Sequence, residues 1–267
     1  MINKLKELYE IDIDYYEELE DGIVFFINDY YYYFIYTDID EEYVIRLFHI
    51  SNKYKKIIPF HSFVFNKNSK VIENGYILFK VNTFINDITF NDVLRFSIVV
   101  HNEEPFNMAS FWENKLDFIE DKIIKIENYK AIENYDYYQG IAEMLLKMIN
   151  RKDNTIYLTH STFNSLSSLS FYNPLNIVFD YRERDIASYI RITKDYSLIN
   201  RVINNLDYNY FLVRLCFPFS YFDSLYNYIN KKTEYVDDDI LEYEKYLLNI
   251  ERILNIHLFN YIKKVAI

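Results

Sequence analysis

The chain has 267 residues, of which 51% are hydrophobic, so it is long enough to form one large domain or two small lobes around a sizeable core. Its 40 acidic residues outnumber its 29 lysines and arginines and give a net charge of −11. This balance argues against nucleic acid and anionic lipid as partners, because both bind cationic protein surfaces.

The N-terminal part begins with a helical pattern and two strand patterns. Residues 1–10 are charged and helical in pattern, without the apolar core of a signal peptide. Residues 22–28 and 30–37 are short runs rich in β-forming residues, and Asn28-Asp29 between them suits a hairpin turn.

A helix and two further strands follow this hairpin. Residues 38–57 carry apolar side chains at helical spacing behind an acidic first turn, which predicts an amphipathic helix. Pro59 ends it, and residues 58–65 and 76–82 predict strands on either side of a polar turn. The order β-β-α-β-β indicates a small α/β lobe.

The rest of the chain is helical in pattern. Apolar stripes at helical spacing run along residues 112–126, 137–148 and 240–261, and the last follows an acidic cap at 237–239. We therefore predict a small α/β lobe at 1–82 and a helical lobe at 83–267, joined by a short hinge near 80–84. No flexible linker separates the two.

Several functional classes lack their usual residues. Only three glycines occur, and no glycine-rich phosphate loop is among them. Cys216 is the one cysteine, which excludes an internal disulfide and any multi-cysteine metal site. No apolar run is long enough for a membrane span, so the cytoplasm is the expected compartment. The 29 tyrosines and 22 phenylalanines are what an AT-rich genome would produce.

Residues 157–165 are the first stretch that could carry chemistry. An extended apolar run leads into His160 and small polar residues, as in a catalytic loop that follows a strand. Ser161 and Thr162 lack a glycine elbow and a paired base, so a nucleophile is disfavoured. A structural role for His160 is the favoured interpretation.

Residues 173–191 are the second such stretch. A strand-like piece ends in Asp180 and is followed by a charged turn and a helix. Carboxylates at Asp180 and Asp185 are suited to Mg²⁺. The favoured interpretation is a buried ion-pair cluster, because three arginines nearby would neutralise both carboxylates: Arg182, Arg184 and Arg191.

The order of several motifs resembles the bacterial spore coat kinase-like proteins of the CotS/YutH type, which are similar in fold to aminoglycoside phosphotransferases and choline kinases. The motifs lie at residues 111–113, 138–143 with Gly140, 157–160, 174–187 and 214–222. The resemblance is strongest from residue 111 to 229 and only topological before residue 83. It implies an α+β, protein-kinase-like two-lobe fold.

The resemblance also implies where the functional residues should lie. On the H-G-D-x-x-x-x-N pattern of the aminoglycoside group, His160 matches the His, Thr162 takes the place of the catalytic Asp, and Ser167 that of the Asn. On the I-D-[FW]-[DE] pattern, Val178 takes the place of the metal-binding Asp.

Of the remaining positions in the family pattern, the phosphate-binding lysine is missing and several structural residues are present. The strand at 30–37 contains no lysine to pair the phosphates, and Lys80 is in the wrong strand. Asp185 matches the family's structural aspartate, and Arg184 and Gly140 belong to motifs that are kept.

We therefore predict a catalytically degenerate kinase-like protein, a pseudokinase that uses no cofactor and acts through protein partners, in a spore coat if the resemblance extends that far. The alternative is a divergent small-molecule phosphotransferase that uses Mg-ATP, with Asp180 on the metal, Lys80 on the phosphates, and His160 or Thr162 near the acceptor. A binding module for a ligand other than a nucleotide stays open as a third reading.

Overall fold

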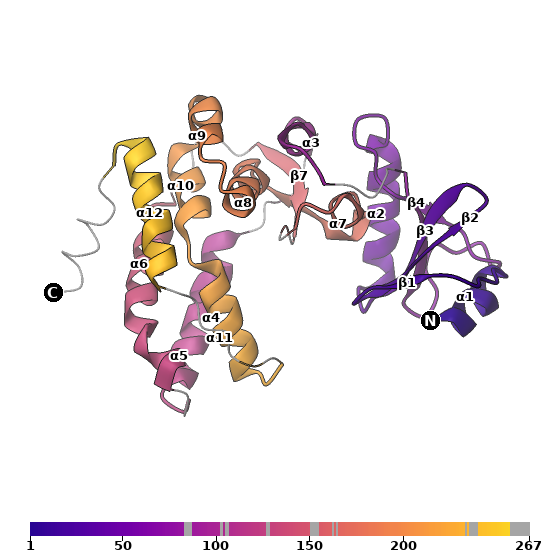
Figure 1. Cartoon of the computed structure of the whole chain (residues 1–267), viewed down its shortest axis with the longest axis horizontal. Helices are drawn as coiled ribbons and strands as arrows, with labels where there is room; N and C mark the ends of the chain where they lie inside the picture. The colour runs from indigo at the N-terminus through magenta and orange to yellow at the C-terminus, as the bar shows by residue number, and fades with distance from the viewer. Residues whose placement is uncertain are drawn as a thin grey trace. The chain divides into compact units, whose positions relative to one another are not determined.

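The computed structural model describes residues 1–82, 87–101, 104, 107–126, 129–149, 155–161, 163, 165–232, 234 and 240–256 (Figure 1). The chain forms two compact units, the first made of Met1–Val100 and Tyr157–Phe179, the second of His101–Ile156 and Asp180–Ile267. The predicted lobe boundary after residue 82 is a different division and stays a prediction. Residues 83 and 84 of its hinge, and the acidic cap at 237–239, lie outside the described residues.

A five-stranded antiparallel sheet is the centre of the first unit. Its strand order is β1-β2-β3-β5-β4, and α2 is inserted between β3 and β4. This bears out the predicted order β-β-α-β-β and adds a short edge strand before it. The elements are β1 (Glu17–Glu18), β2 (Gly22–Ile27), β3 (Tyr30–Tyr36), α2 (Glu41–Tyr54), β4 (Ser62–Val64) and β5 (Tyr76–Lys80).

The two faces of this sheet are covered by different helices, because residues paired across antiparallel strands share a face (Figure 1). On one face, α1 (Ile2–Tyr9) packs Leu5 against Ile23, Phe34 and Leu78. On the other face, α2 brings the Phe48 ring to 5.6 Å from the Phe63 ring. Asp40 starts α2 by accepting hydrogen bonds from two backbone amides of its first turn.

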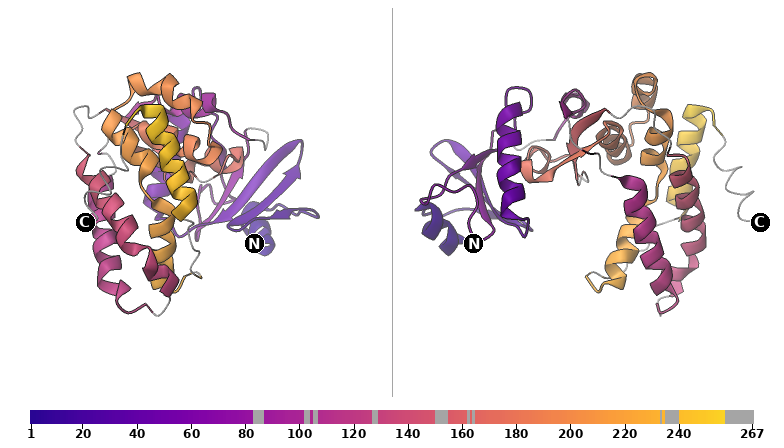
Figure 2. Two further views of the ribbon diagram at one scale, coloured as in Figure 1. Left: turned by 60° about the vertical axis from the view of Figure 1, so that its left-hand side comes forward. Right: turned by 180° about the vertical axis from the view of Figure 1, so that it is seen from behind.

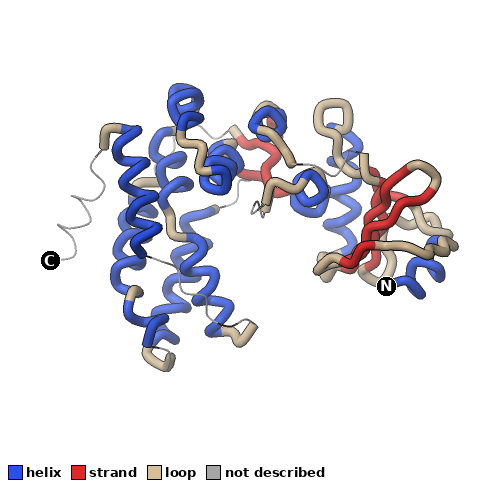
Figure 3. Tube along the Cα trace, in the orientation of Figure 1, coloured by secondary structure: helices blue, strands red, loops and turns tan. Residues whose placement is uncertain are grey.

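A second, three-stranded sheet has the order β6-β7-β8, from Val100–His101, Ile156–His160 and Ile177–Asp180. Figure 3 shows these strands as a separate group from the five-stranded sheet. The chain passes from one unit to the other within or at the start of each of these strands. The first unit also holds α3 (Phe90–Phe96), α7 (Ser168–Phe171) and the 3₁₀ turn η1 (Pro174–Asn176).

The second unit is helical. Its main helices pack side by side in each view (Figures 1 and 2), with Trp112 of α4 against Phe217 and Phe222 and with Tyr138 of α6 stacked on Tyr221. The helical stripes predicted at 112–126 and 137–148 are therefore core packing. The helices are α4 (Met108–Ile123), α5 (Tyr129–Glu133), α6 (Tyr135–Lys147), α8 (Glu183–Thr193), α9 (Ser197–Val202), α10 (Tyr208–Cys216), α11 (Phe219–Ile229) and α12 (Ile240–Leu254).

Side chains cap the end of α10, where backbone carbonyls have no partner within the helix. Tyr243 and Tyr246 of α12 donate their hydroxyls to the carbonyls of Cys216 and Leu215. Arg191 of α8 donates to the Phe217 carbonyl at 2.9 Å. Three helices are thus fastened at one point. Among the described residues, no helix has the length and apolar character that crossing a bilayer requires.

Candidate functional site

Strand β7 delivers His160 into an aromatic cluster. The His160 ring is 2% exposed and stacks on Phe171, with ring centroids 4.2 Å apart, while Phe96 lies 4.4 Å away on a tilted plane. Its Nε2 is 2.8 Å from the backbone oxygen of Phe171. The histidine that matches the catalytic loop therefore fastens β7 to α7, which is the structural role favoured from the sequence.

The loop after β7 holds the two other positions that match the phosphotransferase pattern. Thr162, in the place of the catalytic aspartate, lies outside the described residues. Ser167 is half-buried at the N-cap position of α7, and its backbone pairs with that of Asp87. Ser161 is exposed, and its amide donates to the Asn176 carbonyl at 2.7 Å, which fixes the start of the loop.

Strand β8 ends in a carboxylate whose two oxygens are fully engaged. Asp180 is 0% exposed. Its Oδ1 accepts from the Tyr181 amide at 2.7 Å and from the Tyr210 hydroxyl at 3.0 Å. Its Oδ2 accepts from Arg184 at 2.8 Å and from Arg214. This geometry favours the ion-pair interpretation of Asp180 over a metal ligand.

The ion pairs follow from the turn between β8 and α8. Arg184 is four residues after Asp180 in the first turn of α8, so its guanidinium reaches back to the strand end. Burial and the neighbouring Arg214 guanidinium lower the pKa of Arg184. Asp185, which is 2% exposed in the same helical turn, acts electrostatically on both arginines. Two buried arginines are thus balanced by two buried aspartates.

The arginine partners differ in part from those expected. Arg184 pairs with Asp180, but Arg182 donates to the Asn205 carbonyl and Arg191 to the end of α10. The second partner is Arg214, which the sequence reasoning did not include. It lies on α10, far from Asp180 along the chain, and no local spacing in the sequence predicts that the two residues are in contact.

Magnesium does not fit the described residues at this site. Both Asp180 oxygens are saturated by donors, and Val178, which takes the place of the family's metal ligand, offers only its backbone oxygen to Thr159 at 3.1 Å. In the part of the chain that the structure describes, no three His, Cys, Asp or Glu side chains gather as a metal site would require.

Lys80 and Gly140 occupy unrelated places. Lys80 ends β5, and its ammonium lies 3.1 Å from the centroid of the Tyr30 ring, on the α1 face of the sheet. A Cβ at Gly140 would meet nothing within 4 Å, so packing in α6 does not explain this glycine.

Helix α2 contacts β8 through residues that the sequence reasoning did not single out. The Tyr43 hydroxyl donates to the Ile177 carbonyl at 3.4 Å, and the Arg46 guanidinium lies 5.4 Å from the centroid of the Phe179 ring. Arg46 itself is exposed. A single exposed arginine in an amphipathic helix has no sequence signal that separates it from a solubilising charge.

The α2 face of the five-stranded sheet also carries an exposed aromatic pair. Phe26 of β2 and Tyr31 of β3 face each other across the strands, with ring centroids 4.9 Å apart, and are 57% and 41% exposed. The Tyr31 carbonyl accepts from the Val81 amide at 2.9 Å, so the pair lies beside the chain that leaves β5.

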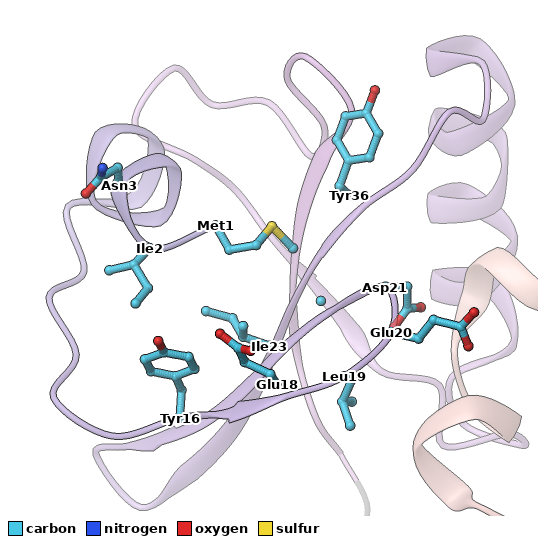
Figure 4. A pocket seen from close by; sticks show the side chains of 11 residues that line it. Met1, Ile2, Asn3, Tyr16, Glu18, Leu19, Glu20, Asp21, Ile23 and Tyr36 are labelled. Atoms are coloured by element: carbon cyan, nitrogen blue, oxygen red, sulfur yellow. The ribbon is translucent and has the colours of Figure 1, made fainter.

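A pocket of about 760 Å³ lies on the opposite, α1 face of the sheet (Figure 4). Met1, Tyr16, Glu18 and Ile23 gather on one side of it, and Glu20 lies on the other. Its carboxylates disfavour an anionic ligand such as a phosphate. The full lining is Met1, Ile2, Asn3, Tyr16, Glu18, Leu19, Glu20, Asp21, Gly22, Ile23 and Tyr36.

The fold is that of a solved antibiotic kinase. The chain is similar to spectinomycin phosphotransferase APH(9)-Ia in complex with ADP and spectinomycin, with a TM-score of 0.57 and 13% identity over 93% of this chain and 92% of that one. It is also similar to the AMP-bound complex of that enzyme, with a TM-score of 0.51 and 14% identity over 93% of each chain. No protein family's sequence profile matches the chain, and no curated protein sequence does.

These comparisons confirm one prediction and overturn another. The fold is kinase-like and α+β, with a small antiparallel sheet in its N-terminal part and a mostly helical remainder, as predicted. The prediction that no cofactor is used is wrong, because the fold is shared with a phosphotransferase solved with ADP and with AMP. Membership of the spore coat family is not confirmed.

Proposed function

We propose that this chain binds an adenine nucleotide and transfers a phosphoryl group from ATP to a small molecule. The observation that carries this proposal is the fold, which is shared over 93% of the chain with a phosphotransferase that was solved with ADP and spectinomycin. At 13% identity the likeness extends to the fold alone, so the acceptor is assigned only as a small molecule.

The α2 face of the five-stranded sheet is where we place the base. Phe26 and Tyr31 present exposed rings there, and a nucleobase stacks on aromatic side chains without needing a particular hydrogen-bond pattern. The opposite face holds the pocket with Glu18 and Glu20, whose charge would repel the phosphates.

Transfer by this chain is expected to be slow. Loss of a general base typically lowers a rate by a factor of about 10² to 10⁴, and Thr162 stands where the related enzymes place an aspartate. Asp180 is held by Arg184 and Arg214 and is not available to a reacting group.

The state of Asp180 favours a second candidate function, in which the chain binds nucleotide without transferring phosphate and acts by contact with other proteins. A carboxylate whose oxygens are bound by two arginines is not available to a metal ion or to a reacting group. A coat or assembly role, as the family resemblance implies, belongs to this second candidate. The fold supports the first function and the side chains support the second.

One pair of measurements separates the two. ADP binding is measured by calorimetry, and ADP release from ATP is measured with and without spectinomycin and a panel of other hydroxylated small molecules. Acceptor-dependent release supports phosphotransfer. Binding without release by any acceptor supports the second candidate, and a protein that binds neither ADP nor ATP contradicts both.

A further inference from the structure

The pocket on the α1 face of the five-stranded sheet is not used by the proposed function (Figure 4). Its volume of about 760 Å³ falls within the range of about 300–1,000 Å³ that is typical of small-molecule sites. The residues that line it come from 1–3, 16–23 and the end of β3, all within the first unit. Phe26 and Tyr31 lie on the other face of the sheet, so this pocket is separate from the proposed base site.

Two carboxylates at this pocket are exposed and have no partner among the described residues. In that part of the chain, neither the Glu18 nor the Glu20 side chain forms a hydrogen bond or an ion pair. Lys4 and Lys6, the two lysines of α1, form ion pairs with carboxylates outside the pocket lining. The amino group of Met1 forms no ion pair with a described carboxylate. Two negative charges are therefore available to a ligand.

These two carboxylates are set apart from each other. Figure 4 shows Glu18 beside Tyr16 and Ile23 on one side of the pocket and Glu20 on the other side. Within the described ranges, no three side chains of the metal-binding types come together, which disfavours a single metal ion held by both carboxylates. A ligand that meets both must itself carry two positive groups at some distance from each other.

The same lining offers apolar and aromatic surface. Ile23 belongs to the core beneath α1, and the Tyr16 ring is 39% exposed. Methylene groups are stabilised against such surfaces, and an ammonium group is attracted to the face of a tyrosine ring. The turn that carries Glu20 is closed by a hydrogen bond from the Leu19 amide to the Gly22 carbonyl at 2.8 Å, so this part of the wall is fixed before a ligand binds.

We infer that this pocket binds a flexible aliphatic polyamine, with one ammonium group at Glu18, a second at Glu20 and the methylene chain against Tyr16 and Ile23. The net charge of −11 attracts such a ligand to the protein, and the separation of the two carboxylates selects spaced amines over a compact cation. This inference goes beyond the proposed function and does not depend on it.

The test measures spermidine binding by calorimetry at low ionic strength, for the wild-type chain, Glu18→Gln, Glu20→Gln and the double variant. Each single substitution should weaken binding about fivefold, the upper end of what an exposed ion pair contributes, and the double substitution about twenty-five-fold, because the two carboxylates meet separate amines.

Glu17→Gln is the matched control. Glu17 is the neighbouring exposed carboxylate of β1, and it does not line the pocket, because side chains alternate between the two faces of a strand. Its substitution removes the same charge from the same strand and should leave the affinity for spermidine unchanged within about twofold.

Two other ligands test the inference on the wild-type chain alone, without relying on any variant. Mg²⁺ carries two charges on one centre, and n-butylamine carries one ammonium group on an aliphatic chain. Each should bind at least about fivefold more weakly than spermidine, because neither reaches both carboxylates. The inference is overturned if spermidine does not bind, if Mg²⁺ binds equally well, or if Glu17→Gln weakens binding as much as Glu18→Gln.

Discussion

Strands β7 and β8 each end in a residue that matches a phosphotransferase motif, and the surroundings of these two residues are opposite in character. His160, at the end of β7, is surrounded by Phe96 and Phe171 and bonds one backbone oxygen. Asp180, at the end of β8, is surrounded by Arg184 and Arg214 and accepts four hydrogen bonds. One end is apolar and the other is ionic.

The difference shows that two residues in similar places can be buried by different means. A histidine ring can be buried by stacking on aromatic side chains and by hydrogen bonding. A buried carboxylate needs full pairing, and once paired it is difficult to remove. Both residues are therefore part of the packed interior, but replacing them should lower the stability of the fold by very different amounts.

Removing the carboxylate at the end of β8 should cause the largest loss in the free energy of unfolding. Asp180→Ala leaves Arg184 and Arg214 buried with less compensating charge, and removal of one partner from a buried pair typically costs about 3–5 kcal/mol. Urea unfolding would measure the change. Glu113→Gln, an exposed carboxylate on α4, is the control and should change stability by less than about 0.5 kcal/mol. A loss of under about 1 kcal/mol for Asp180→Ala would contradict the ion-pair assignment.

Acid should destabilise the fold through a second buried histidine, His61. This side chain is 1% exposed, and its Nε2 lies 3.0 Å from the Leu169 carbonyl oxygen. Burial lowers the pKa of His61 from 6.5 to about 4. The unfolded chain therefore takes up the proton first, and stability that is complete above pH 6.5 is lost as the pH falls toward 4. A difference of about 2.5 pH units corresponds to about 3 kcal/mol.

The comparison variant for this titration is His61→Gln, which removes the ionisable ring. Its stability should fall less steeply than that of the wild type between pH 6.5 and 4. If the variant does not fold, NMR titration of the His61 ring in the wild type is the direct measurement. A ring that titrates near pH 6.5 would show that the histidine is not buried in this way.

Tyr210→Phe removes a single hydroxyl from the ion-pair cluster around Asp180 and so tests the contribution of one hydrogen-bonding group to stability. That hydroxyl donates to Asp180 at 3.0 Å and accepts from Arg214 at 2.8 Å. Hydrogen bonds to charged groups contribute about 1.5–3 kcal/mol, so we expect a loss of about 2 kcal/mol in thermal or urea unfolding. An additional loss of the same size in the background of Asp180→Ala would mean that the two residues act independently.

The corresponding substitution at the end of β7 is His160→Phe, for which we expect the smallest loss of stability. It keeps the stacking on Phe171 and removes the 2.8 Å hydrogen bond to the backbone oxygen, so the loss should be about 1 kcal/mol. The ratio of this loss to that of Tyr210→Phe compares a hydrogen bond to a backbone oxygen with hydrogen bonds inside the ion-pair cluster. Equal losses would show that the ends of the two strands are not distinct environments.

Local patterns in the sequence predicted the local elements of this fold. The spacing of apolar residues located α2, and Asn28-Asp29 was expected to turn the hairpin. Both residues have positive φ, at 50° and 65°, which Asn and Asp tolerate better than most residues. Arg184 was also predicted, because it lies close to Asp180 in the charged turn that follows the strand.

The parts that the sequence did not predict depend on distant segments. Arg214 reaches Asp180 only because α10 packs on α8, and Arg46 reaches Phe179 only because α2 packs against β8. The short strand β1 has too few residues to show a period, so only its pairing with β2 defines it. Contacts between remote segments leave no periodic signal in one sequence.

The tyrosine hydroxyls that cap the end of α10 show that the high tyrosine content of this chain has a structural use. Abundant tyrosine is what an AT-rich genome would produce, and the codons for tyrosine and phenylalanine differ by a single base. Tyr243, Tyr246 and Tyr221 nevertheless each donate a hydrogen bond to a main-chain oxygen in the helical unit. A change from tyrosine to phenylalanine at these positions would preserve the shape of the side chain and remove a hydrogen bond, so the helical unit depends on the oxygens of these side chains as well as on their rings.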